Sequence, residues 1–495
     1  MKKCFHAIIP IILGLVAAQV IATLQVHLSN AHLYGSLVLI KEAGYLIVPN
    51  QHIMPCLHAW GPAFLGGLFF TLTIGAGLSI VSFSAAWSWD RLFRKRKSFA
   101  IFLLILWMGC LVSLNLRGLI LLAGMYFLVI PPLVFWSTLR WLPQERRKQS
   151  GYKGVLHVIP LLVLALLWGS QADKRLFLDL RDYLLLSNPP GARINDFYYD
   201  YTLYPAEVFK PLHQRLLKTA ILEDVQKKPI VAALKRTLLD NDYLVVETTS
   251  AVDLRIHQAG GGFLLEHQGR TVLRTTLQEF VSKPGAMLRE FSYKCDRYAF
   301  FRLLTFYSLL VAFPITLYLV LHAFICMLLR AFSSRRASLV IASLLCFLIG
   351  VSLWLFFQHQ RPGPVEPKNL AQALDSRRWQ ERVAALRLIE EKHIEIAEFQ
   401  GHGKLLSSPH VPERYWLARA LGMSRRPETY NDLLNFLEDP HLNVVSIAFY
   451  ALGRRGDRRA VPEIIKRIET SQHWYNQWHA YKALRTLGWK QSQSD

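Results

Sequence analysis

Four aspartates near the middle of the chain are the residues best suited to acid–base chemistry. Asp196 and Asp200 lie among aromatic residues that could stack on sugar rings or on a peptide, namely Phe197, Tyr198, Tyr199, Tyr201 and Tyr204. Asp240 and Asp242 flank Asn241 where a helical pattern changes to a strand pattern, the usual place for turn residues. Aromatic residues at helical spacing more often belong to a core. We therefore interpret both groups as structural and predict no catalytic residue.

Histidines gather around the segment that follows the first apolar stretch. His27, His32, His52 and His58 could in principle bind a metal or haem. Their spacing matches no established ligand motif, and histidines near a membrane surface commonly bind water and headgroups. We therefore predict neither a metal nor a cofactor.

Six cysteines occur without a CxxC pair, which argues against a redox or zinc motif. Cys56 and Cys295 each stand a few residues before an apolar stretch. They would then lie at similar depth outside a membrane, and a disulfide between them is a hypothesis.

The composition indicates a membrane protein. Apolar residues make up 52% of the 495 residues, and the net charge is +22. Fifteen Lys and Arg residues lie in four short segments between apolar stretches, around Lys2, Arg91–Lys97, Arg140–Lys153 and Arg330–Arg336. Basic short loops face the cytoplasm in membrane proteins, so the charge indicates topology and no nucleic-acid partner is expected.

Seven apolar segments approach the roughly 20 residues needed to cross a bilayer. They are Phe5–Leu24, Trp60–Phe83, Phe99–Leu114, Leu119–Leu139, Tyr152–Ser170, Leu303–Leu329 and Ala337–Phe357. Six or eight spans are alternatives, because two segments are short and Leu33–Val48 could lie at the membrane interface. The first segment is expected to be a retained anchor, with a cleaved signal peptide as the alternative.

The basic loops place the N-terminus in the cytoplasm and both large polar regions outside. The expected domains are a membrane bundle at 1–170, an extracytoplasmic α+β domain at 171–298, two further spans at 299–358, a linker at 359–366 and a repeat domain at 367–495. A bacterial inner membrane is the expected location, with lipid as one partner.

The second apolar segment carries small residues at every fourth position, namely Ala63, Gly67, Thr71, Gly75 and Ser79. Such a ridge allows another helix to approach closely. None of the seven segments contains an interior Asp or Glu, which argues against an ion-coupled transporter.

The region 171–298 combines helical and strand patterns. Apolar residues between Pro205 and Leu239, among them Ile221, recur at every third or fourth position. This spacing predicts two helices separated at Lys227–Pro229. Four strands are then expected at Tyr243–Glu247, Asp253–His257, Gly262–His267 and Thr271–Thr275, with the Gly260–Gly262 triplet as a hairpin turn.

The C-terminal region repeats with a period of about 31 residues over about four units, each predicted as a helix pair that stacks on the next. Ala420-Leu421-Gly422 recurs as Ala451-Leu452-Gly453. The stretch from Asp439, DPHLNVVSIAFYALGRRGDRRAVPEIIKRIE, resembles HEAT-like repeats of the phycobilin-lyase type. The resemblance implies an α-solenoid with a binding surface, whereas lyase activity does not transfer with the repeat.

Two sets of side chains are candidates for binding a partner protein. The aromatic set on the first helices is Trp416, Tyr450, Trp474, Tyr475 and Trp478, and the set in the turns is Arg425, Arg426, Arg454, Arg455, Arg458 and Arg459. The sequence thus predicts a polytopic membrane protein with an α+β domain and a solenoid, acting as a scaffold for envelope proteins. A permease and a membrane enzyme acting on lipid-linked or envelope glycans are the alternatives.

Overall fold

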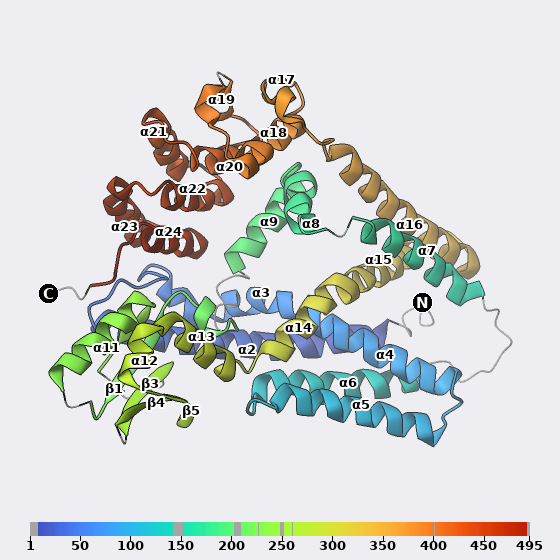
Figure 1. Cartoon of the computed structure of the whole chain (residues 1–495). Coiled ribbons are helices and arrows are strands. Elements are labelled where there is room, and N and C mark those ends of the chain that lie inside the picture. Colours follow the sequence, from blue (N-terminus) through green and yellow to red (C-terminus); the bar gives the residue numbers. More distant parts are fainter. Residues whose placement is uncertain are drawn as a thin grey trace. The chain divides into compact units, whose positions relative to one another are not determined.

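The computed structural model describes residues 8–141, 152–171, 173–201, 209–225, 227–247, 252–259, 261–399 and 401–492. The basic residues Lys2 and Arg146–Lys148, the first residues of the first expected span, and Tyr204 lie outside these ranges. The chain is mostly helical and forms two compact units (Figure 1). One unit contains Met1–Leu28, Trp60–Leu176 and Asp296–Gln358, and the other contains Ser29–Ala59, Phe177–Cys295 and His359–Asp495.

The first unit is built from long apolar helices. They are α2 (Ile9–Glu42, which belongs to the second unit from Ser29 onward), α3 (Trp60–Phe70), η2 (Thr71–Gly75), α4 (Ala76–Arg91), α5 (Lys97–Asn115), α6 (Leu121–Trp141), α7 (Tyr152–Gly169), α14 (Ala299–Tyr307), η5 (Ser308–Ala312), α15 (Phe313–Leu329) and α16 (Arg335–Gln360). Six helices in the described residues are long and apolar enough to cross a membrane. The seventh expected segment falls in α7, whose described apolar part, Val158–Gly169, is shorter.

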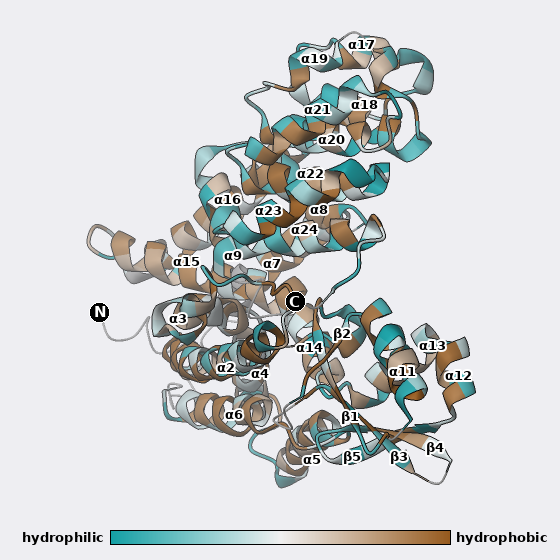
Figure 2. Ribbon diagram, turned by 90° about the vertical axis from the view of Figure 1, so that its left-hand side faces the viewer, coloured by the Kyte–Doolittle hydropathy of each residue, from teal (hydrophilic) through white to brown (hydrophobic). Residues whose placement is uncertain are grey.

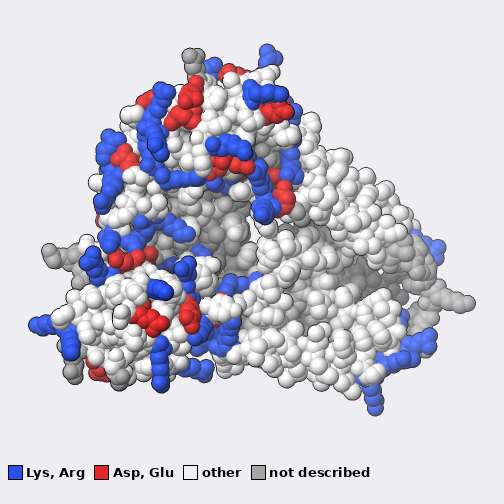
Figure 3. All heavy atoms as spheres, viewed as in Figure 1, with Lys and Arg blue, Asp and Glu red and all other residues white. Residues whose placement is uncertain are grey.

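The outer surfaces of these helices are apolar. Ile101, Phe102, Ile105 and Val112 of α5 are each more than half exposed. In Figure 2 the helices of this unit are brown over most of their length, whereas the repeat helices show both brown and teal faces. Figure 3 shows few charged side chains on the visible face of the unit and a group of basic ones at the end where α4 meets α5.

The ridge of small residues faces α2. A Cβ added to Gly75 would meet the Ala18 side chain at 2.4 Å, and one added to Gly67 would meet the Thr23 backbone at 3.1 Å. Thr71 donates a hydrogen bond to the Gln19 side chain at 2.8 Å. Small residues thus bring the two helices close enough for side chain to backbone contact, as expected for a packing ridge.

The second unit contains a five-stranded sheet in the order β2-β1-β3-β4-β5. The strands are β1 (Lys218–Glu223), β2 (Tyr243–Val245), β3 (Leu254–Ala259), β4 (Gly262–His267) and β5 (Arg270–Thr275). β1 is parallel to β2 and to β3, and β3, β4 and β5 are antiparallel neighbours. The four predicted strands are confirmed, and β3 and β4 pair antiparallel with Ala259 opposite Gly262, whereas Gly260 of the predicted hairpin turn lies outside the described residues.

The prediction of two helices between Pro205 and Leu239 was wrong in its first half. Ile221 lies in β1, and Leu212 lies in the short η4 (Leu212–Gln214); α11 (Lys228–Asp240) is the helix that connects β1 to β2. A central parallel strand is buried on both faces, so its apolar run lacks the alternation that marks a strand. α12 (Leu277–Ser282) and α13 (Pro284–Cys295) pack on the same core through Phe280 and Phe291.

The end of α2 and the loop after it belong to this second unit. Leu37, Ile40, Tyr45 and Ile47 are buried in one cluster with residues of β2 and of the last repeat. The expectation that Leu33–Val48 lies at a membrane interface is therefore replaced by a role in this protein core.

The repeats occupy the C-terminal part of the second unit. Their helices are α17 (Leu370–Leu374), α18 (Trp379–Lys392), α19 (His402–Leu405), α20 (Val411–Leu421), α21 (Glu428–Asn435), α22 (Leu442–Arg455), α23 (Val461–Thr470) and α24 (Trp474–Thr486). α18, α20, α22 and α24 contact one another in sequence and form a continuous row. A Cβ on Gly422 would meet the Ala451 Cα at 2.8 Å, and one on Gly453 would meet the Ala483 Cα at 3.0 Å. The recurrent Ala-Leu-Gly therefore sets the distance between neighbouring helices of the row.

We expect Gly422→Ala to destabilise the repeats by about 1–3 kcal/mol, because the new methyl group has no space without a shift of α22. The matched control is Gly403→Ala, where nothing lies within 4 Å of the added Cβ. Urea unfolding of the full-length protein in detergent, followed by protease sensitivity of the repeats, measures the difference. Equal midpoints for the two variants would show that the close approach is not structurally important.

Candidate interaction surface of the repeats

The row of α18, α20, α22 and α24 is covered by a segment of the same chain. This segment, here called the strap, runs from Phe177 to Tyr201 and contains the end of α8 (Leu176–Asp179), the π-helical η3 (Leu180–Leu185) and α9 (Pro189–Tyr201). Its helix α9 contacts α24 of the last repeat (Figure 1). The face of the repeats that the sequence predicts to bind a partner is therefore covered by a segment of the same chain.

Asp182 of the strap is the centre of this contact and is completely buried. Its Oδ2 atom accepts hydrogen bonds from Arg387 at 2.6 Å and from the Trp416 indole at 2.8 Å. Its Oδ1 atom pairs with the guanidinium of Arg181 at 2.7 Å. One carboxylate therefore joins the strap to two successive repeats.

Asp179 supplies the second carboxylate of the cluster. Arg387 donates to it at 2.6 Å, and Arg361 pairs with it at 2.8 Å. Burial disfavours the charge on Arg387, but Asp182 and its neighbours offset this effect and raise the pKa of the guanidinium above its ordinary value. Two carboxylates and three arginines thus form one ion-pair network between the strap and the repeats.

Aromatic rings of the repeats lie against these guanidinium groups. Arg181 is 3.9 Å from the centre of the Tyr415 ring, and Arg387 is 4.7 Å from that of Trp416. Arg419 lies 4.8 Å from the centre of the same Trp416 ring. Cation–π contacts of this kind gain strength where water is excluded.

The second half of the strap continues the contact toward the last repeat. The amide of Asn195 donates to Asn443 at 2.9 Å, the ring of Tyr199 lies 4.7 Å from that of Tyr475, and Asp200 pairs with His473 at 2.9 Å. Asp200 therefore contributes to the contact between the strap and the last repeat.

A second internal contact comes from the loop after α2. The Asn50 side chain donates to the carbonyl groups of Ile468, Glu469 and Ser471, each at 2.9 Å, and its backbone N–H donates to Gln477 at 2.8 Å. Asn50 thus supplies hydrogen-bond donors to carbonyls at the end of α23 that the helix itself leaves unpaired.

The third contact comes from the turn between α11 and β2. Asp242 accepts a hydrogen bond from the Tyr481 hydroxyl at 2.8 Å and pairs with Arg485 at 2.8 Å, and Asp240 pairs with Lys490 at 2.6 Å. Asp240 and Asp242, two of the four aspartates considered for acid–base chemistry, are therefore bound to basic or hydroxyl groups in α24 or directly after it.

Most of the aromatic residues predicted to bind a partner are used in these contacts. Trp416 and Trp474 are 5% and 6% exposed, and Tyr475 and Trp478 are partly buried against other elements of this unit. Tyr450 is 39% exposed and is the one member of the predicted set that is largely open among the described residues.

The predicted turn arginines divide into two groups. Arg454 pairs with Glu390 at 2.8 Å and Arg455 donates to Thr429 at 2.7 Å, so these two connect neighbouring repeats, whereas Arg459 pairs with Asp457 of its own turn at 2.6 Å. Arg425, Arg426 and Arg458 are exposed in the turns, and Arg454 and Arg459 are exposed as well.

The proposed disulfide does not form in the structure. Cys56 is exposed in η1 (Met54–His58), whereas Cys295 ends α13 and packs against the core of the sheet domain. The similar position of both residues before an apolar helix does not bring their sulfur atoms together, because each side chain is directed by a different local fold.

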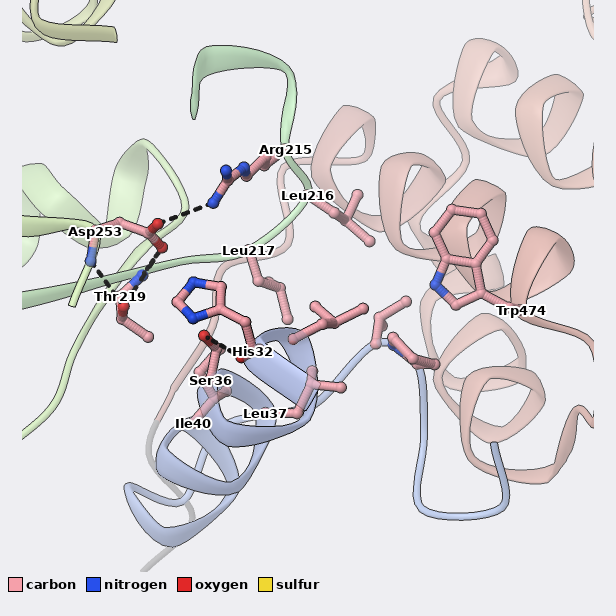
Figure 4. Close-up of a pocket in the computed structure, with 13 residues that line it drawn as sticks. His32, Ser36, Leu37, Ile40, Arg215, Leu216, Leu217, Thr219, Asp253 and Trp474 are labelled. Carbon is pink, nitrogen blue, oxygen red and sulfur yellow. Dashed lines mark hydrogen bonds and ion pairs between the residues drawn. The ribbon is translucent and has the colours of Figure 1, made fainter. Parts of the chain in front are cut away.

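The histidines of the N-terminal region also do not converge. His27 stacks on Trp60 at 3.9 Å, and His58 contacts Tyr34 at 4.1 Å. His32 lines a small cavity of ≈ 40 Å³, where Asp253 binds Arg215 and Thr219 along one wall (Figure 4). No group of three His, Cys, Asp or Glu residues in the described part of the chain could hold a metal ion.

A family model for HEAT repeats matches residues 402–485. The match covers α19 to α24 and identifies the C-terminal helical pairs as HEAT-like repeats. No curated protein and no solved structure matches the chain significantly.

We expect Asp182→Asn to release the strap, because the change leaves buried guanidinium groups without a balancing charge and costs on the order of 3 kcal/mol. The comparison is Asp200→Asn, which removes a partly exposed pair worth about 0–1 kcal/mol. Hydrogen exchange of residues 177–201 in the full-length protein measures the effect. Unchanged protection in Asp182→Asn would contradict the central role of this carboxylate.

Proposed function

We propose that the protein is a membrane-anchored scaffold that recruits or organises other envelope proteins through its HEAT-like repeats. The observation that carries the proposal is the match to HEAT repeats, which commonly bind proteins, in a chain that also has six helices of membrane-spanning length. The finer assignment of the repeats to the phycobilin-lyase type rests on the sequence motif alone.

Membrane insertion is supported by the apolar surface of the first unit. Side chains such as Ile105 and Leu166 are 65% and 74% exposed, and a continuous apolar surface of this kind is unstable in water. We infer seven spans with the basic loops in the cytoplasm, which is consistent with basic side chains at the ends of α4, α6 and α15. This orientation places the sheet domain and the repeats outside the cytoplasm. The membrane that holds the protein is, in this proposal, a bacterial inner membrane.

The surface available to a partner is defined by what the internal contacts leave uncovered. The strap covers Trp416 and Tyr475, whereas Arg425, Arg426, Arg458 and Tyr450 are exposed. A row of arginines favours a partner with an acidic surface, because such charges speed association and select against basic partners.

Transport and glycan chemistry have less support. The carboxylates considered for catalysis are engaged with the repeats, through Asp200–His473 and Asp242–Arg485. No observation on the described residues favours a transport path over helix packing.

The scaffold proposal predicts that partners depend on the exposed arginines. Crosslinking in native membranes should capture a defined set of proteins with the wild type and lose it with the triple change of Arg425, Arg426 and Arg458 to Ser. The control replaces Lys235, Arg236 and Arg270, exposed on the sheet domain, with Ser and has the same change in charge. Loss of the same proteins from both variants, or from neither, would contradict recognition by the repeat turns.

The orientation predicts the reactivity of exposed thiols. Cys56, which is exposed, should react with a membrane-impermeant maleimide on intact cells, and Cys56→Ser should abolish that part of the labelling. An Arg94→Cys change, in the loop after α4, should be labelled only after the cells are permeabilised. Labelling of Cys56 only after permeabilisation would reverse the proposed topology.

A further inference from the structure

A histidine stands directly before the first helix in each of the last three repeats. His410 precedes α20, His441 precedes α22 and His473 precedes α24. The side chains of His441 and His473 cap their helices, because each accepts a hydrogen bond from the backbone N–H group two residues later. A ring nitrogen accepts such a bond only while it carries no proton. These two caps therefore require an unprotonated Nδ1 atom.

The cap formed by His441 lies at the contact with the second half of the strap. Its Nδ1 atom accepts a hydrogen bond from the N–H group of Asn443 at 3.3 Å. The side chain of Asn443 accepts one from the amide of Asn195 in α9 at 2.9 Å. Both asparagines are buried, and the side chain of His441 is 14% exposed. The residue that receives the cap is thus also the one that binds α9.

Charged groups of the strap, of α20 and of the turn before α22 act on the His441 ring. Asp196 and Asp439 favour a proton on the ring, whereas Arg414 and Arg181 oppose one. Asp196 lies 3.6 Å from Nε2 and is 45% exposed, and Asp439 already binds Arg414 at 2.6 Å, so the attraction of both carboxylates is weakened. Burial is the largest influence and lowers the pKa of His441 below its ordinary value of 6.5. The positive end of the α22 dipole also disfavours a charged ring.

The closed form of α9 therefore favours a neutral His441. When α9 leaves the repeats, the ring is exposed to water and takes up a proton near its ordinary pKa of about 6.5. Below that pH the open form binds more protons than the closed form, so the closed form loses stability as the pH falls. The loss ends below the lowered pKa of the closed form, because both forms then carry the proton.

We propose that this contact is an acid-sensitive switch, in which protonation of His441 releases α9 from the repeats. Release uncovers Tyr475, whose ring lies 4.7 Å from that of Tyr199 in the closed form. The buried ion-pair network keeps the first half of the strap in place, so the switch concerns α9 alone. The pH response requires neither a partner nor a particular membrane orientation. Its use to open the repeat surface to a partner rests on the proposed function.

Hydrogen exchange of the full-length protein in nanodiscs, at about pH 7.5 and about pH 5.5, measures the opening of α9. Protection factors are compared, because they remove the intrinsic effect of pH on exchange. The protection of residues 189–201 should fall about five- to tenfold at the lower pH, since one proton is taken up on opening. Equal protection at the two pH values would overturn the proposal.

A His441→Asn variant separates the titration from the cap. Asn is a preferred N-cap residue, so α22 should stay protected while the titrating ring is absent. The protection of α9 should then be the same at both pH values. The control is His393→Asn, at an exposed position of the repeats with a φ of 57° that Asn tolerates, and it should respond like the wild type. An undiminished response in His441→Asn, or a loss of the response in the control, would contradict the role of the His441 ring.

A His441→Ser variant replaces His441→Asn if the latter lowers the protection of α22 at the higher pH. Ser is also a strong N-cap residue and has a smaller side chain, and the same outcomes decide. No partner takes part in these measurements. The switch can therefore fail while partners still depend on the turn arginines, and it can hold when they do not.

Discussion

The buried ion-pair network around Asp179 and Asp182 is the interaction on which the second unit depends. Charges removed from water are stable only when partners surround them, and here three arginines and a tryptophan N–H do so. Removal of either the carboxylates or the arginines leaves charged groups buried without a partner of opposite charge. The strap and the repeats therefore form one structural unit, although Asp182 and Arg387 are 205 positions apart in the sequence.

The terminal helix pairs of a repeat array lack one stabilising neighbour, because each pair is stabilised mainly by the pairs on either side. In the last repeat, two segments distant in sequence supply the missing contacts. Asn50 binds the carbonyl groups that end α23, and Asp242 binds Tyr481 and Arg485 of α24. The sheet domain and the loop after α2 thus act as a cap for the solenoid, which explains why they share a compact unit with it.

The features predicted correctly from the sequence are those with a local period. The strands β3 to β5 show alternating burial, and the Ala-Leu-Gly repeat marks helices that pack closely. Ile221 was misread because a strand buried on both faces has no alternation. The strap was missed as a ligand of the repeats, since its partners lie far along the chain. Its signal was nevertheless present, because Asp179, Arg181 and Asp182 interrupt an otherwise apolar run, and charges in such a run need buried partners.

The internal contacts also change which residues can select a partner. Aromatic side chains usually dominate protein interfaces, and the sequence alone favoured those of the repeats. Trp416 and Tyr475 are, however, already paired with the strap, so a partner could reach them only by displacing Asp182 and Tyr199. Displacement would have to recover the energy of the buried ion pairs, which is a high threshold for a transient partner. Recognition by Arg425, Arg426 and Arg458 has no such cost, because these side chains already face solvent. Charge at the turns is therefore the more accessible basis for selecting a partner of this solenoid.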